Sequence, residues 1–317
     1  MTQTQKIKTV IEKYFIVVSL FFLICFFSVL ADNFFSAATL MTILNQLPAL
    51  TVVAVGVTLV LIVGEIDLSV GSILGLSAAI IGTATISWGL PLWLACLFAL
   101  MLGGLCGLVN GTLTSYLSLP SFIVTLGMLE VARGLAYIST DSQTIYIGSS
   151  IQAIALPLSS TGISPALIIS ILIVVLAHFV LNRTVFGRYI VAIGSNHKAA
   201  TISGIEIKPY RTLVLVISGL LAGLGGIFNA AYLGSSDPNA GLGMELSAIA
   251  AAVIGGTSLM GGRGSIIGAF AGVLIIAVLQ NGLAQLGVSE PVKRLITGSV
   301  IILAVLFDRW RSQKQQN

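Results

Sequence analysis

The sequence carries very little charge. Only 8% of its 317 residues are Asp, Glu, Lys or Arg, whereas soluble domains carry roughly 25% charged residues. Hydrophobic residues make up 56% of the chain, and its mean hydropathy is +1.06. This balance excludes a soluble globular protein and predicts an all-α polytopic membrane protein.

Residues that commonly carry chemistry are also scarce. The three cysteines, Cys25, Cys96 and Cys106, all fall in apolar segments, and no CxxC spacing occurs. The two histidines, His178 and His197, have no serine or cysteine partner at a recognisable spacing. We therefore expect no metal site, no cofactor and no catalytic site in this chain.

Two further classes of protein are disfavoured by what is missing. The glycine-rich run GGTSLMGGRG, residues 255–264, lacks the GxxxxGK[ST] signature of a phosphate-binding loop, so we interpret it as a flexible or tightly packed bend between helices. The net charge of +4 comes from a few separate clusters. No basic patch for nucleic acid is present.

Apolar runs of the length needed to cross a bilayer, about 20 residues, dominate what remains. We expect ten spans, near residues 14–31, 45–63, 69–87, 91–112, 120–138, 165–182, 212–232, 245–260, 264–284 and 292–307. The run 14–31 is longer than the apolar region of a signal peptide, so we expect it to be retained as a helix. Close helix packing is indicated by GxxxG spacings at Gly103/Gly107, Gly107/Gly111, Gly219/Gly223 and Gly268/Gly272.

The basic residues predict the topology. They cluster before the first span, between the sixth and seventh, and after the tenth. The positive-inside rule then makes the N-terminus (1–13), the loop 183–211 and the tail (308–317) cytoplasmic. The loop 139–164 contains no Lys or Arg, as expected outside, although Lys293 and Arg294 near the outer end of the last span are exceptions. Residues 1–317 are expected to form one transmembrane domain.

The two halves of the chain echo each other weakly. Five residues of the first half recur at a constant spacing in the second: Asn110, Gly111, Ser118, Pro120 and Gly127 correspond to Asn281, Gly282, Ser289, Pro291 and Gly298. In the expected topology the matched spans run in opposite directions. This pattern indicates an inverted repeat of five plus five spans, a common plan of transporters.

Carboxylates in or beside apolar runs are candidates for a translocation path. The segment GEIDLSVGS, residues 64–72, holds Glu65, Asp67 and Ser69. An ionisable group at mid-membrane costs roughly 2.5–3.5 kcal/mol on insertion scales. The segment is therefore either a polar turn at the membrane surface or a discontinuous element beside the path.

Two other places have the same ambiguity. Glu130 and Arg133 are three residues apart, so they share a helix face and form either a structural pair or part of the path. The segment 235–246, SSDPNAGLGMEL, carries Asp237, Asn239 and Glu245. Expected to face outward, it either receives a polyol or a delivering protein, or simply connects two spans.

Three ordered motifs carry a resemblance to a known family. GEIDLSVGS (64–72), GRYIVAIGSNHKAATISGI (187–205) and ELSAIAAAVIGGTSLMGGRGSIIGAFAGVL (245–274) together resemble the permease subunit of ribose-type ABC importers. The resemblance covers nearly the whole chain and is strongest from residue 187 onward. Departures in the first four spans and in the loop 139–164 leave the sugar open, since the family also handles xylose, galactose and a furanosyl autoinducer.

The resemblance implies a bacterial inner-membrane permease that moves a monosaccharide or similar polyol by alternating access. Its implied partners are a cytoplasmic ATPase with two fused nucleotide-binding domains, a periplasmic or tethered sugar-binding protein, a second permease copy and the membrane lipid. A homodimer is expected, with a heterodimer of permeases left open. The docking helix would lie near 194–204, and the implied docking residues are Gly187, Arg188, Gly194, Asn196, His197, Lys198, Ala199, Ala200, Ser203 and Gly204.

An ion-coupled secondary sugar transporter is the alternative function. Glu65, Asp67 and Glu130 would then bind or release the coupling ion. The polar loop 183–211 argues against it, because a carrier that works alone has no need of a docking surface.

Overall fold

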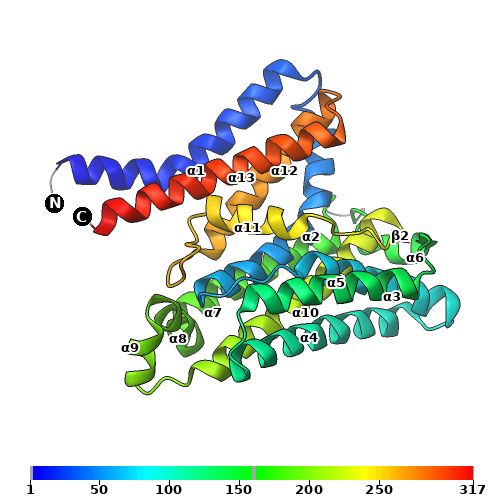
Figure 1. Ribbon diagram of the computed structural model, residues 1–317. Coiled ribbons are helices and arrows are strands. Elements are labelled where there is room, and N and C mark those ends of the chain that lie inside the picture. Colours follow the sequence, from blue (N-terminus) through cyan, green and yellow to red (C-terminus); the bar gives the residue numbers. More distant parts are fainter. Residues whose placement is uncertain (1–2, 159–161, 317) are drawn as a thin grey trace.

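The computed structural model describes residues 3–158 and 162–316, which are mostly helical (Figure 1). Its long helices are α1 (Gln3–Leu30), α2 (Ala37–Ile62), α3 (Val70–Gly82) with the π-helix η1 (Thr83–Ser87), α4 (Leu92–Tyr116), α5 (Ser121–Ser139), α7 (Pro165–Arg183), α10 (Ile207–Leu233), α11 (Met244–Ile254), α12 (Ile266–Gln285) and α13 (Glu290–Gln316). The short elements are β1 (Ile145–Tyr146), α6 (Ser149–Gln152), α8 (Val185–Ser195), α9 (His197–Ile202) and β2 (Ser235–Ser236).

Seven of these helices are long and apolar enough to cross a membrane: α2, α3 with η1, α4, α5, α7, α10 and α12. This confirms the predicted polytopic membrane protein. The spans expected near 14–31, 245–260 and 292–307 overlap α1, α11 and α13. In the described part of the chain, these three helices are not among the seven. The total of ten crossings and the position of the termini stay predictions.

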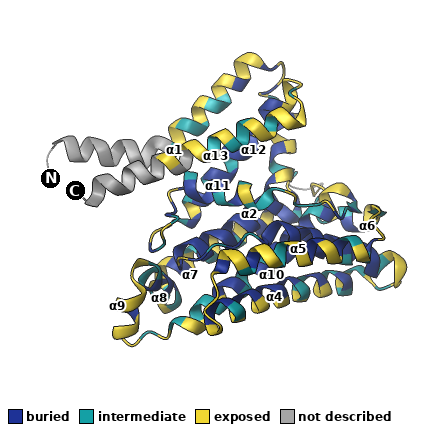
Figure 2. Ribbon diagram, in the orientation of Figure 1, coloured by how far each residue is buried: buried dark blue, intermediate teal, exposed yellow. Residues whose placement is uncertain are grey.

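Helices α2 and α3 form the centre of the bundle. In α2, 83% of the most apolar 18-residue stretch is buried, whereas the corresponding share is 28% in α5 and in α7. Figure 2 accordingly shows α2 mostly dark blue and α4 and α5 with exposed outer faces. Helix α10 packs against α2, α3 and α4. The outer faces of α4, α5 and α7 are therefore left for lipid or for another protein.

Glycines bring α4 and α10 into backbone contact. A Cβ atom added to Gly107 would lie 2.9 Å from Cα of Val216, and one added to Gly219 would lie 2.9 Å from the backbone nitrogen of Gly107. Real Cβ atoms essentially never approach other atoms so closely. The predicted use of these glycines in packing within one chain is confirmed.

The bundle has two distinct ends (Figure 1). Helices α8 and α9 lie at one end, and α6 and β2 lie at the other. At the α8–α9 end, the C-terminus of α2 contacts the bend 255–264, where Gly262 N donates to Ile62 O at 2.9 Å. At the opposite end, β1 pairs with β2 in an antiparallel ladder. The position of every site below is given relative to these two ends.

The residues of the predicted repeat have matching surroundings in several cases. Asn110 and Asn281 are both buried. A Cβ added at Gly127 on α5 or at Gly298 on α13 would meet nothing within 4 Å. These likenesses fit the inverted repeat, which stays a prediction.

Candidate functional site

The expected docking segment folds as two helices joined at Asn196. The Thr184 side chain caps α8 by accepting from Gly187 N at 3.3 Å, and the Asn196 side chain caps α9 by accepting from Ala199 N at 3.0 Å. The segment 194–204, where we expect the docking helix, therefore spans the end of α8 and the whole of α9, and its docking role stays a prediction. Gly194 belongs to the last turn of α8, and α9 alone forms the tip.

Most of the predicted docking residues are exposed at this tip. Gly187 and Ala200 are buried and Gly194 is half-buried, while the exposed ones are Arg188, Asn196, His197, Lys198, Ala199, Ser203 and Gly204. Sequence reasoning missed Ile202, whose side chain is 88% exposed on α9. Met260, in the bend 255–264 at the same end, is 85% exposed. This end of the bundle therefore carries exposed apolar side chains beside the exposed polar ones.

Helix α8 rests directly on the end of α2. A Cβ added to Gly194 would lie 2.7 Å from the backbone nitrogen of Gly262 and would also collide with the carbonyl of Ile62. Gly261 packs against Gly64 in the same place, where its own added Cβ would lie 3.0 Å from Cα of Gly64. The bend 255–264 is tightly packed. Of the two alternatives predicted for it, a flexible or a tightly packed bend, the second is confirmed.

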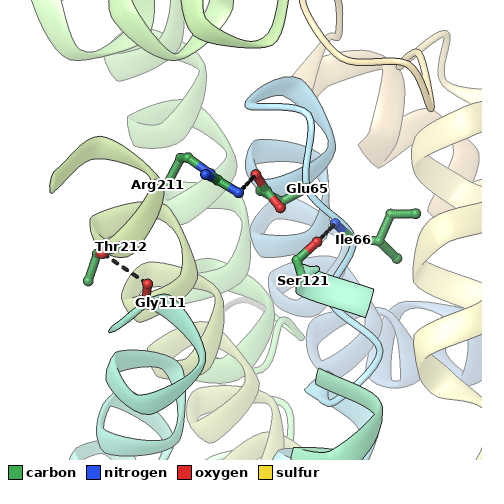
Figure 3. A network of polar contacts seen from close by, with 6 residues as sticks. All are labelled: Glu65, Ile66, Gly111, Ser121, Arg211 and Thr212. Atoms are coloured by element: carbon green, nitrogen blue, oxygen red, sulfur yellow. Dashed lines mark hydrogen bonds and ion pairs between the residues drawn. The ribbon is translucent and has the colours of Figure 1, made fainter. Parts of the chain in front are cut away.

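The junction between α2 and α3 holds the carboxylates of the first candidate segment. Glu65 forms an ion pair with Arg211, on the first turns of α10 (Figure 3). The side chains of Glu65 and Arg211 are only 6% and 20% exposed. Beside them, Ile66 N donates to Ser121 Oγ at 3.1 Å, and Thr212 Oγ1 donates to Gly111 O at 3.1 Å. Four helices, α2, α4, α5 and α10, thus meet at this ion pair.

Asp67 is locked deeper in the same junction. Its carboxylate accepts from Ser69 N at 2.9 Å, Ser69 Oγ at 2.6 Å and Ser218 Oγ at 2.9 Å. Asn110 on α4 donates to Ser69 Oγ at 2.9 Å. Burial raises the pKa of Asp67, against the lowering effect of these hydrogen bonds. Glu65, Asp67 and Ser69 are all buried, and their contacts hold α4 and α10 against the α2–α3 junction.

Arg133 and Glu130 form no ion pair in the described part of the chain, so the structural pair, one of the two alternatives for these residues, is not seen there. The Nη1 atom of Arg133 donates instead to the carbonyls of Pro238 at 2.5 Å and Ala240 at 2.9 Å. Glu130 is exposed on the outer face of α5. The segment after β2 brings these two carbonyl oxygens to α5, while the buried Nε atom of Arg133 has no hydrogen-bond partner among the described residues.

That segment, 235–243, is not a plain outward-facing loop. It lies along α3, because Gly82 packs against Ser236, and an added Cβ on Gly75 would lie 2.6 Å from the carbonyl of Ala240. Non-helical backbone at this depth is tolerated only where protein or a water-filled cavity covers it. Because the residues 235–243 are not helical and lead directly into α11, we call 235–243 and α11 together the interrupted segment.

The polar side chains of this segment are partly engaged. Tyr137 Oη donates to Asn239 Oδ1 at 2.6 Å, and Asp237 accepts from Asn239 N at 2.8 Å. Glu245 lies against Gly71. Apart from Glu130 on the outer face of α5, the tentative path residues thus fall into two groups, with Glu65, Asp67 and Ser69 at the α2–α3 junction and Arg133, Asp237, Asn239 and Glu245 around the interrupted segment.

A cavity of about 560 Å³ opens beside the interrupted segment. Helices α2, α10, α11, α12 and α13 line it, and its polar wall includes five carboxamides: Asn45, Gln46, Asn229, Gln280 and Asn281. Sequence reasoning missed this cavity. The signal was present as amides inside apolar runs, but the search for ionisable groups passed over them.

Comparison with known proteins identifies the family. Residues 39–305 match the family described as the permease component of the branched-chain amino acid transport system. The fructose import permease of Rhizobium meliloti is 38% identical over 297 residues, covering 91% of this chain and 82% of the relative. No solved structure was found to match.

Two further relatives come from Escherichia coli strain K12. The ribose import permease is 39% identical over 298 residues, covering 92% of each chain. The D-allose transport system permease is 35% identical over 300 residues, covering 94% of this chain and 92% of the relative. The chain therefore belongs to the family of multi-pass inner-membrane permeases that serve ABC-type sugar importers in bacteria.

Proposed function

We propose that this chain is the transmembrane subunit of an ATP-driven importer that carries a neutral monosaccharide inward by alternating access. A separate cytoplasmic ATPase with two fused nucleotide-binding domains drives it. The observation that carries the proposal is the exposed tip of α9, which follows directly on α8, the helix that Gly194 seats on the end of the buried helix α2. The sugar class comes from relatives named for ribose, fructose and D-allose import.

The contacts at the α8–α9 end suggest how force reaches the bundle. A movement of α8 presses on Ile62 at the end of α2 and on the bend 255–264. The ion pair of Glu65 with Arg211 ties this point to α10. Packed interiors transmit such displacements because they have few voids to absorb them. We propose that ATP-driven motion of the ATPase is passed to α2 and α10 in this way.

A second copy of the chain is proposed to cover the outer face of α5. Gly127, Glu130 and Gly134 share that face, and an added Cβ at either glycine would meet nothing within 4 Å. A carboxylate facing lipid at mid-membrane costs roughly 2.5–3.5 kcal/mol. A homodimer places Glu130 beside its symmetry mate or a water-filled path. A sugar-binding protein is proposed to dock at the opposite end from α9.

The function is tested by purifying the chain from its native membrane in mild detergent, identifying its partners, and reconstituting the complex. We expect an ATPase and a sugar-binding protein to co-purify. Proteoliposomes should then accumulate ribose, fructose or allose only when ATP is supplied to the ATPase side. Uptake that requires an ion gradient and ignores ATP would instead support the ion-coupled carrier.

Docking through α9 makes a separate prediction about Ile202. Replacing Ile202 by Glu puts a charge where an apolar side chain, 88% exposed in the free chain, would be buried against the ATPase. Loss of a central apolar anchor costs about 2 kcal/mol or more, so we expect the affinity for the ATPase to fall roughly thirtyfold or more. Biolayer interferometry between purified permease and ATPase measures it.

Leu156 supplies the matched control for this prediction. It is an exposed apolar residue, 56% exposed, in the loop that follows α6 at the opposite end. Leu156→Glu should leave ATPase binding unchanged. Equal affinities for the wild type, Ile202→Glu and Leu156→Glu would remove α9 from the docking surface.

A further inference from the structure

The cavity beside the interrupted segment gathers carboxamides from three different helices. Asn45 and Gln46 lie on α2, Asn229 on α10, and Gln280 and Asn281 on α12. Polar side chains within membrane helices are rare, and they face the bundle interior or a water-filled cavity and mark substrate pathways. Five of them around one cavity therefore require an explanation beyond helix packing.

Part of this polar wall is already hydrogen-bonded. Asn281 Nδ2 donates to Gln46 Oε1 at 2.8 Å, and Gln46 Nε2 donates to Tyr232 Oη at 3.0 Å. This chain links α12, α2 and α10 and fixes the orientation of the Gln46 amide. Because the Tyr232 hydroxyl accepts there, its own proton is left to donate to another acceptor.

Other groups in the wall are left without a partner. Asn229 Oδ1 is buried and has no hydrogen-bond partner among the residues that the structure describes. A buried acceptor without a partner costs about 1–3 kcal/mol, so such an atom is satisfied by water or by a ligand in the functioning protein. Gln46 and Gln280 remain exposed within the cavity.

The charge and size of the cavity indicate the ligand class. Its charged lining residues, in the described part of the chain, are Glu290, Lys293 and Arg294 at the start of α13, and Lys293 Nζ lies 3.4 Å from Glu290 Oε2. The remaining polar wall is neutral and offers both donors and acceptors, which is what hydroxyl groups need. A volume of about 560 Å³ lies within the 300–1,000 Å³ of typical ligand sites.

The backbone beside the cavity is also interrupted. Gly241, Leu242 and Gly243 line the cavity, and α11 begins immediately afterwards at Met244. The two glycines have φ values of +75° and +79°. Interrupted membrane helices expose backbone groups to the substrate in many transporters. Here the interruption places Gly241, Leu242 and Gly243 in the wall beside the carboxamides.

We propose that this cavity, lined by a single copy of the chain, binds the neutral sugar during transport through Gln46, Asn229, Tyr232 and Gln280. The inference rests on the proposed function and adds a site to it within each permease subunit. The sugar hydroxyls donate to the free carboxamide oxygens and accept from the Tyr232 hydroxyl and the amide NH₂ groups. The cavity lies toward the end opposite α9, because Gln46 precedes Ile62 along α2 by about 24 Å.

Uptake by the reconstituted complex provides the first test. The probes are radiolabelled ribose, fructose and allose, and the variants are Gln46→Leu and Asn229→Leu. We expect the uptake of the transported sugar to fall about tenfold in each variant, while ATP hydrolysis stimulated by the loaded binding protein stays at the wild-type level. Neither substitution alters the surfaces that bind the ATPase and the sugar-binding protein. Only the transport step that needs the cavity is therefore lost.

Gln285→Leu is the matched control. Gln285 Nε2 donates to Thr39 Oγ1 at 2.6 Å, so it joins α12 to α2 as Asn281 does but lies outside the cavity lining. Its loss removes a similar interhelical hydrogen bond, and we expect wild-type uptake. A tenfold loss in Gln285→Leu equal to that in Gln46→Leu would assign the effect to helix packing and overturn the proposal.

Thiol protection gives a readout that does not depend on transport. In a chain whose Cys25, Cys96 and Cys106 are replaced by Ala, Asn229→Cys is labelled with a water-soluble methanethiosulfonate. We expect millimolar amounts of the transported sugar to slow this labelling severalfold. Labelling that is unaffected by sugar, together with normal uptake by the Leu variants, would refute the cavity site while leaving the proposed function intact. Uptake by the wild-type complex that requires an ion gradient and ignores ATP would instead refute the proposed function.

Discussion

Replacement of Arg211 by Ala is expected to lower the free energy of unfolding by about 3 kcal/mol, the lower end of the range for breaking a buried ion pair. The partner, Glu65, is 6% exposed and would be left as an uncompensated charge among α2, α4, α5 and α10. The lower end applies because the Arg211 side chain keeps 20% of its surface exposed. Unfolding of the purified chain in mixed micelles with increasing SDS, followed by circular dichroism, measures this change.

Two controls make the result specific. The double variant Glu65→Leu with Arg211→Leu should be more stable than Arg211→Ala, because it removes both charges and leaves none unpaired. Arg188→Ala, which removes an exposed arginine from α8, should change stability by less than about 0.5 kcal/mol. If Arg211→Ala were as stable as Arg188→Ala, the ion pair would hold no structural role.

Replacement of Gly194 by Val is expected to abolish ATP-driven sugar uptake. The added side chain has no space, since even its Cβ would collide with the carbonyl of Ile62 and lie 2.7 Å from Gly262 N. Overpacking of this kind costs about 1–3 kcal/mol, which displaces α8 from α2 without unfolding the bundle. Uptake into proteoliposomes, measured beside the ATP hydrolysis of the same complex, should show hydrolysis that no longer drives transport.

Ser195→Ala is the control at the adjacent position. The Ser195 hydroxyl donates only within α8, to Val191 O at 2.8 Å, so its loss leaves the contact with α2 in place. We expect wild-type uptake from this variant. Normal uptake by Gly194→Val as well would show that the contact between α8 and α2 does not transmit the driving motion.

Hydropathy predicted most helices well but not their ends. The fourth expected span, 91–112, is the helix Leu92–Tyr116. Helix α2 begins at Ala37, earlier than the expected 45, because the polar residues of its first turns dilute the hydropathy while the Ser36 side chain caps the helix. Helix α11 ends at Ile254, before the expected 260, because Gly256 takes a φ of +88°.

The candidate sites were only partly predictable for a different reason. Sequence spacing relates only neighbours on one helix, so it offers Glu130 as a partner for Arg133, whereas Arg133 donates to the carbonyls of Pro238 and Ala240, which are remote in the chain. Ile202 became notable only once its exposure was known. The carboxamide cavity depends on five helices meeting, and no single segment carries that information.

The glycine contacts between α4 and α10 also constrain how the molecule moves. Backbones that touch at Gly107 and Gly219 have no side-chain rotamers between them that can rearrange. The two helices must therefore turn together as one rigid body during each transport cycle. Bending is left to the junctions that flank α10, where Gly204 and Gly234 have φ values of +81° and +68°.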